Sequence, residues 1–170
     1  MCKSLYIVEG LPCSGKSTTA KYIADLLQGA CIDEGSGNHP ADYEFHAYLT
    51  QAEMAQLPKA WQDLLPEYEV LQGGYLIPLA SLTETGPLFE ALLQHKIYDF
   101  LPWEVEKPIM LEKWHQFGKA YTKGAHEKAY VFNCVFLQNP MCETMMRFGF
   151  EEEVSKAYIE DIIGQMPEVE

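Results

Sequence analysis

The feature that most restricts how this chain can fold is a glycine-containing segment near its beginning, from Gly10 to Thr18. Residues 10–17 match the pattern G-x-x-x-x-G-K-[ST] at every fixed position. The segment follows a short, partly β-branched apolar run, Ser4–Glu9, and leads into Lys16–Gln28, where apolar residues recur at helical spacing. A loop of this kind requires this order of strand, loop and helix in order to bind phosphate groups.

Each residue type in this loop has a physical role in binding a nucleoside triphosphate. Gly10 and Gly15 allow the backbone to wrap closely around an anion, and the N–H groups and the positive end of the helix dipole point at the phosphates. We expect Lys16 to reach the β- and γ-phosphates, Ser17 to offer its hydroxyl to Mg²⁺, and Thr18 to help hold the α-phosphate. The residues expected to bind the nucleotide are Gly10, Leu11, Pro12, Cys13, Ser14, Gly15, Lys16, Ser17 and Thr18.

The order of the remaining elements predicts an α/β fold. Two further strands are expected, Ala30–Asp33 and Ala129–Leu137, and Gly29 is expected to cap the helix before the first of them. The second strand is apolar on both sides, as a central parallel strand must be, and should lie beside the first strand of the chain. Strands that alternate with helices predict a three-layer P-loop NTPase fold, with a parallel sheet and helices on both faces.

We expect a single domain over residues 1–170, with a small helical and hairpin insert at about 41–125. Three strands are fewer than P-loop sheets usually contain, and the chain ends after an amphipathic helix, where another strand would be expected next. We therefore expect these 170 residues to be the N-terminal part of a longer protein. A native gene product of 19.3 kDa would contradict that expectation.

The insert is predicted to combine helices with one hairpin. Ala41–Leu65 reads as mainly helical, with a break at Pro58. Tyr68–Leu71 and Tyr75–Leu79 flank a Gly-Gly pair, which indicates a hairpin, and Pro78 should restrict that hairpin to a sheet edge.

Four more helices are predicted, and the second of them carries aromatic residues on related faces. These residues, Trp114, Phe117 and Tyr121, are expected to lie in the core. The predicted helices are Pro87–Phe100, Lys107–Lys123, Pro140–Phe148 and Glu151–Ile163, the last with an acidic first turn that suits the helix dipole.

Composition excludes several classes of protein. With 12 Lys and Arg against 25 Asp and Glu, a formal net charge of −13, the chain lacks the positive charge that drives binding to nucleic acid. No apolar run approaches the roughly 18 residues of a membrane helix, and no signal-peptide pattern precedes the first strand. The five scattered cysteines include no C-x-x-C pair, which favours reduced thiols. We therefore predict a cytoplasmic protein with no nucleic-acid or membrane partner.

Phosphoryl transfer also needs a carboxylate on the metal side and a group that takes the proton of the acceptor. The metal-side carboxylate normally ends the strand beside the loop, but Ala129–Leu137 contains Asn133 and no acid. Asp33 and Glu34 close the second strand, where open α/β folds bind their ligands, and are the candidate catalytic bases; a solvated turn is the alternative. Glu9 could contact the water shell of the metal or the acceptor, or it could simply be solvated.

The segment from Val8 to Thr18 resembles the P-loop nucleoside and nucleotide kinases, particularly thymidylate and deoxynucleoside kinases, whose loops often read Glu-Gly-x-x-Gly-Ser-Gly-Lys-Ser-Thr. The match is good for about the first 35 residues. The resemblance implies a five-stranded parallel sheet, transfer of the γ-phosphoryl group of ATP to a small acceptor, and a catalytic base at Asp33 or Glu34. The acid–arginine pair that usually ends the third strand of the family is absent, since the sequence from Asn133 reads Asn-Cys-Val-Phe, and a lid segment with arginines is missing as well.

The scarcity of arginine restricts the acceptor. A nucleoside monophosphate usually needs several bidentate arginine contacts, whereas Arg147 is the only arginine here and is expected to form a surface ion pair. We therefore expect a hydroxyl-bearing acceptor with little or no charge, in a pocket formed by the aromatic-rich segment from Tyr43 to Tyr121. His39 and Asp42 could line this pocket or cap a helix.

One function is favoured and two alternatives stay open. The favoured function is that of an ATP-dependent small-molecule kinase, a phosphotransferase with Mg²⁺ as cofactor. The alternatives are a nucleotide-binding regulatory module without efficient turnover, and an ATPase. ATP is preferred because no guanine-reading Asn-Lys-x-Asp motif is present, but GTP stays open, as do the identity of the acceptor and the oligomeric state.

Overall fold

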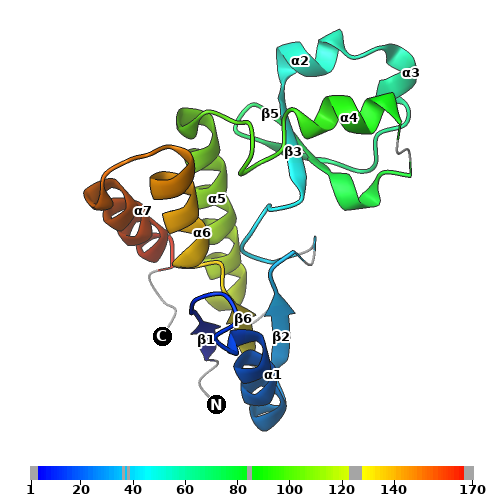
Figure 1. Cartoon of the computed structure of the whole chain (residues 1–170). Coiled ribbons are helices and arrows are strands. Elements are labelled where there is room, and N and C mark those ends of the chain that lie inside the picture. Colours follow the sequence, from blue (N-terminus) through cyan, green and yellow to red (C-terminus); the bar gives the residue numbers. More distant parts are fainter. Residues whose placement is uncertain (1–3, 36, 38, 84–85, 123–127, 167–170) are drawn as a thin grey trace. The chain divides into compact units, whose positions relative to one another are not determined.

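The computed structural model describes residues 4–35, 37, 39–83, 86–122 and 128–166 (Figure 1). The chain divides into two compact units. The first joins Met1–Asp42 to Leu111–Glu170, and the second is the continuous segment Tyr43–Met110, which falls within the predicted insert. None of the helices in the described ranges has both the length and the apolar character needed to cross a membrane.

The first unit contains a three-stranded parallel sheet. β1 (Leu5–Val8) and β2 (Ala30–Asp33) both pair with β6 (Tyr130–Asn133), which gives the strand order β1-β6-β2. The α/β class and the predicted position of the third strand beside the first are therefore confirmed.

One face of this sheet packs against α1 (Lys16–Leu27). Ala20 and Ala24, one helical turn apart, are buried and contact Val131 of β6. Because side chains alternate along a strand, Phe132 points to the opposite face. That face meets the aromatic ring of Phe117 on the helix that precedes β6.

The helix α5 (Trp103–Thr122) begins earlier than predicted. The carbonyl of Pro102 accepts hydrogen bonds from the N–H groups of Val105 and Glu106, so the first turn forms ahead of Lys107, where the helix was predicted to begin. Phe117 of α5 lies 5.2 Å from Phe132 between ring centroids. The predicted core residues of this helix are confirmed as buried: Trp114, Phe117 and Tyr121. Lys123, the last residue of the predicted helix, lies outside the described residues.

The end of α1 differs from the prediction by one residue. The left-handed residue is Gln28, with φ 52°, and the N–H of Gly29 donates to the carbonyl of Ala24 at 2.8 Å. Gly29 is needed for a different reason. A Cβ atom at this position would lie 2.6 Å from the carbonyl oxygen of Ala129, which is the acceptor for the first N–H of β2.

The second unit contains an antiparallel sheet whose first strand the sequence did not reveal. β3 (His46–Thr50) pairs with β5 (Gly74–Pro78), which pairs in turn with β4 (Glu69–Leu71). The prediction of helix over Ala41–Leu65 is therefore wrong for its first part, because pairing with β5 overrides the local helical pattern.

The helical part of this region starts only after β3. Thr50 caps α2 (Gln51–Gln56) through a capping box in which the Thr50 hydroxyl and the Glu53 carboxylate bond to each other's backbone N–H groups. The predicted break at Pro58 is confirmed, since α3 (Lys59–Gln62) begins directly after it.

The predicted hairpin is also confirmed, but its position in the sheet is not. β4 and β5 form an antiparallel pair in which Leu71 lies opposite Gly74 and Glu69 lies opposite Leu76. β5 is the middle strand of its sheet, so the expectation that Pro78 confines it to an edge is wrong. Pro78 is the last residue of the strand, where a missing N–H costs the ladder least.

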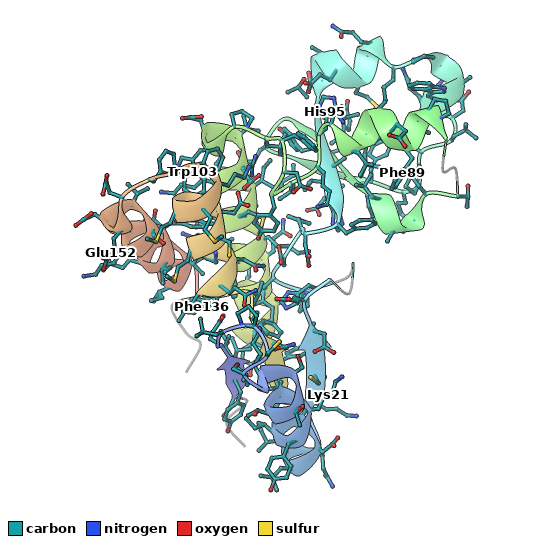
Figure 2. All side chains as sticks on the ribbon, viewed as in Figure 1. Lys21, Phe89, His95, Trp103, Phe136 and Glu152 are labelled. Atoms are coloured by element: carbon teal, nitrogen blue, oxygen red, sulfur yellow. The ribbon has the colours of Figure 1, made fainter. Side chains whose placement is uncertain are left out.

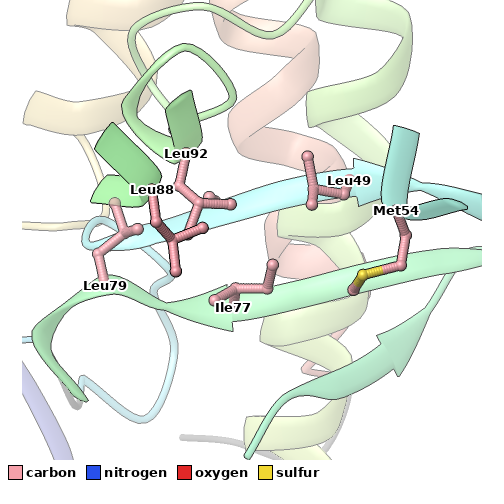
Figure 3. Packing of buried hydrophobic residues seen from close by; sticks show 7 residues of the cluster. Leu49, Met54, Ile77, Leu79, Leu88 and Leu92 are labelled. Atoms are coloured by element: carbon pink, nitrogen blue, oxygen red, sulfur yellow. The ribbon is translucent and has the colours of Figure 1, made fainter. Parts of the chain in front are cut away.

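A compact apolar core joins this sheet to the helix that follows it (Figure 3). Leu88 and Leu92 of α4 (Pro87–Leu93) pack with Leu49, Ile77 and Leu79. Leu79 is the first residue of the short 3₁₀ turn η1 (Leu79–Ser81).

The predicted helix Pro87–Phe100 ends early, at Leu93. The backbone of the next residues bonds to β3 instead: the carbonyl of His95 accepts from Tyr48, and the N–H of Ile97 donates to His46. Tertiary pairing therefore ends α4.

The strand β6 also ends earlier than predicted, at Asn133 rather than Leu137. Cys134 and Val135 have φ values of 66° and 90°, which turn the chain out of the sheet. The chain then forms three helical segments: α6 (Gln138–Met141), the π-helical segment η2 (Cys142–Arg147) and α7 (Glu152–Gly164).

Candidate functional site

The glycine loop (Gly10–Thr18) connects β1 to α1 and is exposed from Gly10 to Gly15. Its backbone turns twice through the left-handed region, at Cys13 with φ 63° and at Gly15 with φ 90°. Between these turns the N–H of Ser14 donates to the carbonyl of Leu11 at 3.1 Å. The loop is therefore a defined turn whose surface is open to a ligand.

The two fixed glycines of the loop pattern are favoured by its geometry for different reasons. A Cβ atom at Gly10 would lie 2.7 Å from Oγ of Ser14, so the Ser14 hydroxyl would have to move to admit a side chain. Gly15 has free space around it, but its positive φ is one that residues with a Cβ atom rarely adopt.

The first turn of α1 carries no protein group that would compensate its positive end. Gly15 is the N-cap residue and makes no side-chain capping bond, and no acidic residue lies in the first turn. The first N–H groups of a helix lack partners within the helix and attract anions. This helix start therefore fits an anionic ligand better than it fits any neighbouring side chain that the structure describes.

The carboxyl ends of the three strands lie in register beside this helix start. Asn133 is paired with Val8 on one side and with Asp33 on the other. Its amide nitrogen Nδ2 donates to Oγ of Ser17 and to Oδ1 of Asp33, both at 3.0 Å. The structure thus brings together two of the predicted site residues, Ser17 and Asp33, through a third residue that is only 4% exposed.

The two candidate catalytic carboxylates have different surroundings. Asp33 also faces the ammonium group of Lys21, labelled on α1 in Figure 2, at 3.7 Å. Glu34 is exposed and accepts a hydrogen bond from Nε2 of Gln138 at 3.3 Å. Asp33 therefore shares the amide of Asn133 with Ser17, whereas Glu34 is hydrogen-bonded to the first residue of α6.

Glu9 has a role that sequence reasoning missed. Its carboxylate accepts hydrogen bonds from the backbone N–H groups of Phe136 at 2.8 Å, Leu137 at 2.9 Å and Gln138 at 3.3 Å. It therefore holds the turn between β6 and α6. No signal along the chain could have indicated this, because 127 to 129 positions separate the partners.

His39 and Asp42 lie in an irregular segment rather than at the start of a helix, as the sequence suggested. Both are buried. Nδ1 of His39 accepts the N–H of Ala41 at 3.1 Å, and the ring lies 4.5 Å from that of Phe132. Burial, and to a smaller extent the charge of Lys113, lowers the pKa of His39 to about 4. His39 is therefore neutral at physiological pH and cannot supply positive charge to a phosphate.

Asp42 is tied to the same helical segment as Glu34. Its Oδ2 accepts a hydrogen bond from Nδ2 of Asn139 at 3.1 Å. The residues after β2 are thus connected twice to α6, by Gln138 with Glu34 and by Asn139 with Asp42.

The only arginine is committed to an ion pair. Its NH1 nitrogen lies 2.6 Å from Oε2 of Glu143, and the side chain of Glu143 is only 8% exposed. The guanidinium group also lies 4.5 Å from the centre of the Phe148 ring. The expected ion pair of Arg147 is confirmed, but one of its partners is buried instead of lying at the surface.

The part of the chain that the structure describes holds no group of three or more His, Cys, Asp and Glu side chains arranged to bind a metal. Mg²⁺ is usually held by one or two carboxylates together with substrate phosphates and water, and so it needs no such cage. The residues that fit this ion are Ser17, through its hydroxyl, and the Asn133–Asp33 pair beside it.

A separate cavity of about 580 Å³ lies in the second unit. Its lining includes the apolar Leu76, the aromatic Tyr68 and the polar side chains of His46 and Glu69. The cavity has the size and mixed lining of a small-molecule site. The cavity lies within the segment from Tyr43 to Tyr121, where the sequence predicted an acceptor pocket.

Comparison with family models, with curated proteins and with solved structures gave no match to this chain. Its function is therefore argued from the geometry of the glycine loop and the strand ends around it.

Proposed function

We propose that this chain is an ATP-binding P-loop protein, related in fold to the nucleoside and nucleotide kinases, that transfers the γ-phosphoryl group to a small hydroxyl-bearing acceptor. The observation that carries the proposal is the meeting of Ser17, at the end of the glycine loop, with the carboxyl ends of β6 and β2. A hydroxyl at the start of a helix, next to polar strand ends of a parallel sheet, is the arrangement in which nucleotide and metal are bound.

Within this proposal the loop residues have separate tasks. The N–H groups at the start of α1 hold the phosphate oxygens, and Lys16 adds a positive charge at the β- and γ-phosphates. Ser17 is the ligand that the loop offers to Mg²⁺, and when bound the ion neutralises charge on the transferring phosphoryl group. Glu34, which is exposed directly after β2 and accepts a hydrogen bond from Gln138, can take the proton of the acceptor hydroxyl; Asp33 is the other candidate for this task.

The acceptor is proposed to carry little negative charge. Arg147 is engaged by Glu143, so no arginine is available to pair with an acceptor phosphate. Carboxylates predominate here, with Asp33 at the end of β2 and Glu34 and Asp42 in the segment after it. An uncharged alcohol or nucleoside meets less repulsion there than a phosphate ester does.

One observation favours a second candidate function, a regulatory module that binds nucleotide with little turnover. β6 ends in Asn133, an amide, where a carboxylate would be expected to serve the metal. An ATPase is the third candidate. Phosphoryl transfer to an added acceptor separates the first function from both of these.

We also propose that the protein works in the cytoplasm. The four cysteines among the described residues all carry free thiols, and burial, with Glu34 next in effect, raises the pKa of Cys134 to about 12. Buried neutral thiols without a disulfide partner are typical of a reducing compartment.

The test begins with calorimetric titration of ATP and GTP into the wild type and Lys16→Ala, with and without Mg²⁺. We expect Mg²⁺-dependent binding by the wild type and at least about tenfold weaker binding by Lys16→Ala, since hydrogen bonds to charged groups contribute roughly 1.5–3 kcal/mol. Lys156→Ala, an exposed lysine of α7, is the charge-matched control and should bind like the wild type.

The second part of the test adds nucleosides and small alcohols to the tighter nucleotide and follows ADP or GDP. Acceptor-stimulated turnover that Lys16→Ala abolishes would support the kinase. Tight binding without turnover would favour the regulatory module, and turnover that no acceptor changes would favour the ATPase. Equal binding by the wild type and Lys16→Ala would reject the whole proposal.

A further inference from the structure

We propose that Asp33 serves the magnesium ion in place of the acid missing from β6, and that Asn133 is the residue that positions it. The inference rests on the proposed nucleotide-binding function and deepens it. It assigns different tasks to Asp33 and Glu34, the two carboxylates that end β2. Asp33 belongs to the metal side of the site, and Glu34 is left to act on the acceptor.

The first support is the distance between the two groups that would share the ion. Oγ of Ser17 and Oδ1 of Asp33 each lie 3.0 Å from the same nitrogen atom, Nδ2 of Asn133. The two oxygens are therefore no farther apart than twice that distance. Mg²⁺ binds reluctantly without its waters, so a carboxylate at this range can hold an ion on Ser17 through a bound water.

The second support is the buried oxygen of Asn133. Asn133 is 4% exposed, and its Oδ1 has no hydrogen-bond partner among the described residues. A buried amide oxygen without a donor is costly, and such oxygens normally accept from a protein group or an ordered water. A water in the shell of an ion on Ser17 would supply the missing donor.

The orientation of this amide follows from its neighbours. Asp33 is an acceptor only, so the NH₂ group of Asn133 must face it; the reverse orientation would set two oxygens against each other. The nitrogen is then shared by Asp33 and Ser17, and the oxygen is left for a further donor. Asn133 therefore orients Asp33 and contributes an acceptor, but it cannot supply the negative charge itself.

The other carboxylates near the strand ends are committed elsewhere. Glu9 accepts three backbone hydrogen bonds in the turn after β6. Glu34 accepts a hydrogen bond from Nε2 of Gln138 and lies outside the hydrogen-bond group of Asn133, Ser17 and Asp33. Lys21 lies 3.7 Å from Asp33, but it is 63% exposed, and an ion pair of this kind is weak enough for a bound cation to displace.

The experiment measures how much Mg²⁺ strengthens ATP binding in the wild type, Asp33→Asn and Glu34→Gln, by calorimetry with Mg²⁺ and with EDTA. Mn²⁺ bound to the protein–ATP complex, followed by electron paramagnetic resonance, gives metal affinity directly. We expect Asp33→Asn to weaken metal affinity about tenfold, the range for groups that hold a metal's ligands. Its metal-free ATP affinity should stay within about twofold, because the amide oxygen still accepts from Asn133.

Glu34→Gln is the matched control, since it removes the same charge from the neighbouring residue. It should keep the metal affinity of the wild type. A loss caused only by the change in overall charge would appear in both variants.

The sharpest variant exchanges the two side chains, Asp33→Asn together with Asn133→Asp. It keeps the hydrogen-bonded pair and moves the carboxylate to β6, so we expect metal affinity to return to within about threefold of the wild type. Asn133→Leu, which keeps the volume and removes the amide, should lose metal affinity as Asp33→Asn does.

Each result bears on the inference separately from the proposed function. Mg²⁺-dependent ATP binding that Asp33→Asn leaves unchanged would overturn the inference and leave nucleotide binding intact. A loss in Glu34→Gln that matches or exceeds the loss in Asp33→Asn would also overturn it. If the wild type binds no nucleotide with or without metal, both proposals fail together.

Discussion

At the scale of single residues, backbone contacts decide which side chains this chain tolerates. Gly10, Gly15 and Gly29 are glycines for three different reasons: a neighbouring hydroxyl, a positive φ and a neighbouring carbonyl. Only the first two belong to the glycine loop. The third, Gly29, holds β2 close to the residue that precedes β6.

Gly29→Ala should destabilise the first unit. The added Cβ would lie 2.6 Å from the carbonyl oxygen of Ala129, so the start of β2 must move away from β6. We expect a loss of about 1–3 kcal/mol in the free energy of unfolding, measured by urea denaturation. Gly164→Ala, where nothing lies within 4 Å of the added atom, is the control and should be neutral or slightly stabilising. An equal effect in both variants would contradict the close-approach argument.

His39 should make stability depend on pH below neutrality. Its pKa is about 4 in the folded chain and 6.5 in the unfolded chain, so between these values only the unfolded state takes up the proton. Stability should therefore fall as the pH drops from 7 to 4, by up to about 3 kcal/mol from this residue.

The variant that checks this is His39→Asn. An asparagine oxygen can accept the N–H two residues ahead, as Nδ1 of His39 does from Ala41. Urea denaturation at pH 7 and at pH 5 should show a smaller loss of stability in the variant than in the wild type. The same loss in both proteins would mean that His39 is protonated in the folded state.

At the scale of elements, the turn between β6 and α6 does most to shape the site. Asn133 is the last residue of β6, and the next two residues have positive φ values, one of them the β-branched Val135. Such a backbone costs free energy and persists where neighbours hold it. Glu9, the residue after β1, supplies that support, because its carboxylate accepts three backbone hydrogen bonds from this turn.

Glu9→Gln should loosen this turn without unfolding the sheet. Hydrogen bonds to a charged acceptor contribute about 1.5–3 kcal/mol, so we expect the amides of Phe136 and Leu137 to exchange at least about tenfold faster with deuterium. Glu152→Gln, an exposed acidic residue in the first turn of α7, is the control and should leave both amides unchanged. Unchanged exchange rates in Glu9→Gln would show that the turn is stable without the Glu9 carboxylate.

The elements that could be predicted are those whose signals are local. The glycine loop, the helix after it and the hairpin at residues 69–78 each follow from a short stretch of sequence. β3 could not be predicted, because its identity depends on pairing with β5 some 28 positions later. The site was predicted only in part for the same reason. Ser17 and Asp33 are evident candidates, but the residue that joins them lies 116 and 100 positions away from them.

At the scale of the whole molecule, the two units have separate apolar cores. The core of the second unit is built from β3, α2, β5, η1 and α4, and every residue of it falls between Tyr43 and Met110. A second cluster, around Ala20 and Val131, belongs to the first unit. A substitution that destabilises one core should therefore lower the stability of its own unit first.

Leu92→Ala tests this separation. Leu92 is fully buried in the core of the second unit, and truncating it should cost about 2–5 kcal/mol there. Deuterium exchange should quicken at Leu76 and Ile77 of β5, and much less at Val131 of β6. Leu64→Ala, at an exposed leucine of the same unit, should change neither strand. An equal change in β5 and β6 would mean that the units unfold as one.

The strand order of the first unit has a consequence for how the protein is made. β1 and β2 do not pair with each other, and each pairs only with β6. The last residue of β6 is translated 100 codons after the last residue of β2. At roughly 5–20 residues per second a ribosome needs about 5–20 s to cover that distance. During this interval the nascent chain carries two unpaired apolar strands, and the whole second unit, Tyr43–Met110, is synthesised within it. A translational pause just before residue 130 should therefore make the emerging chain more dependent on chaperones.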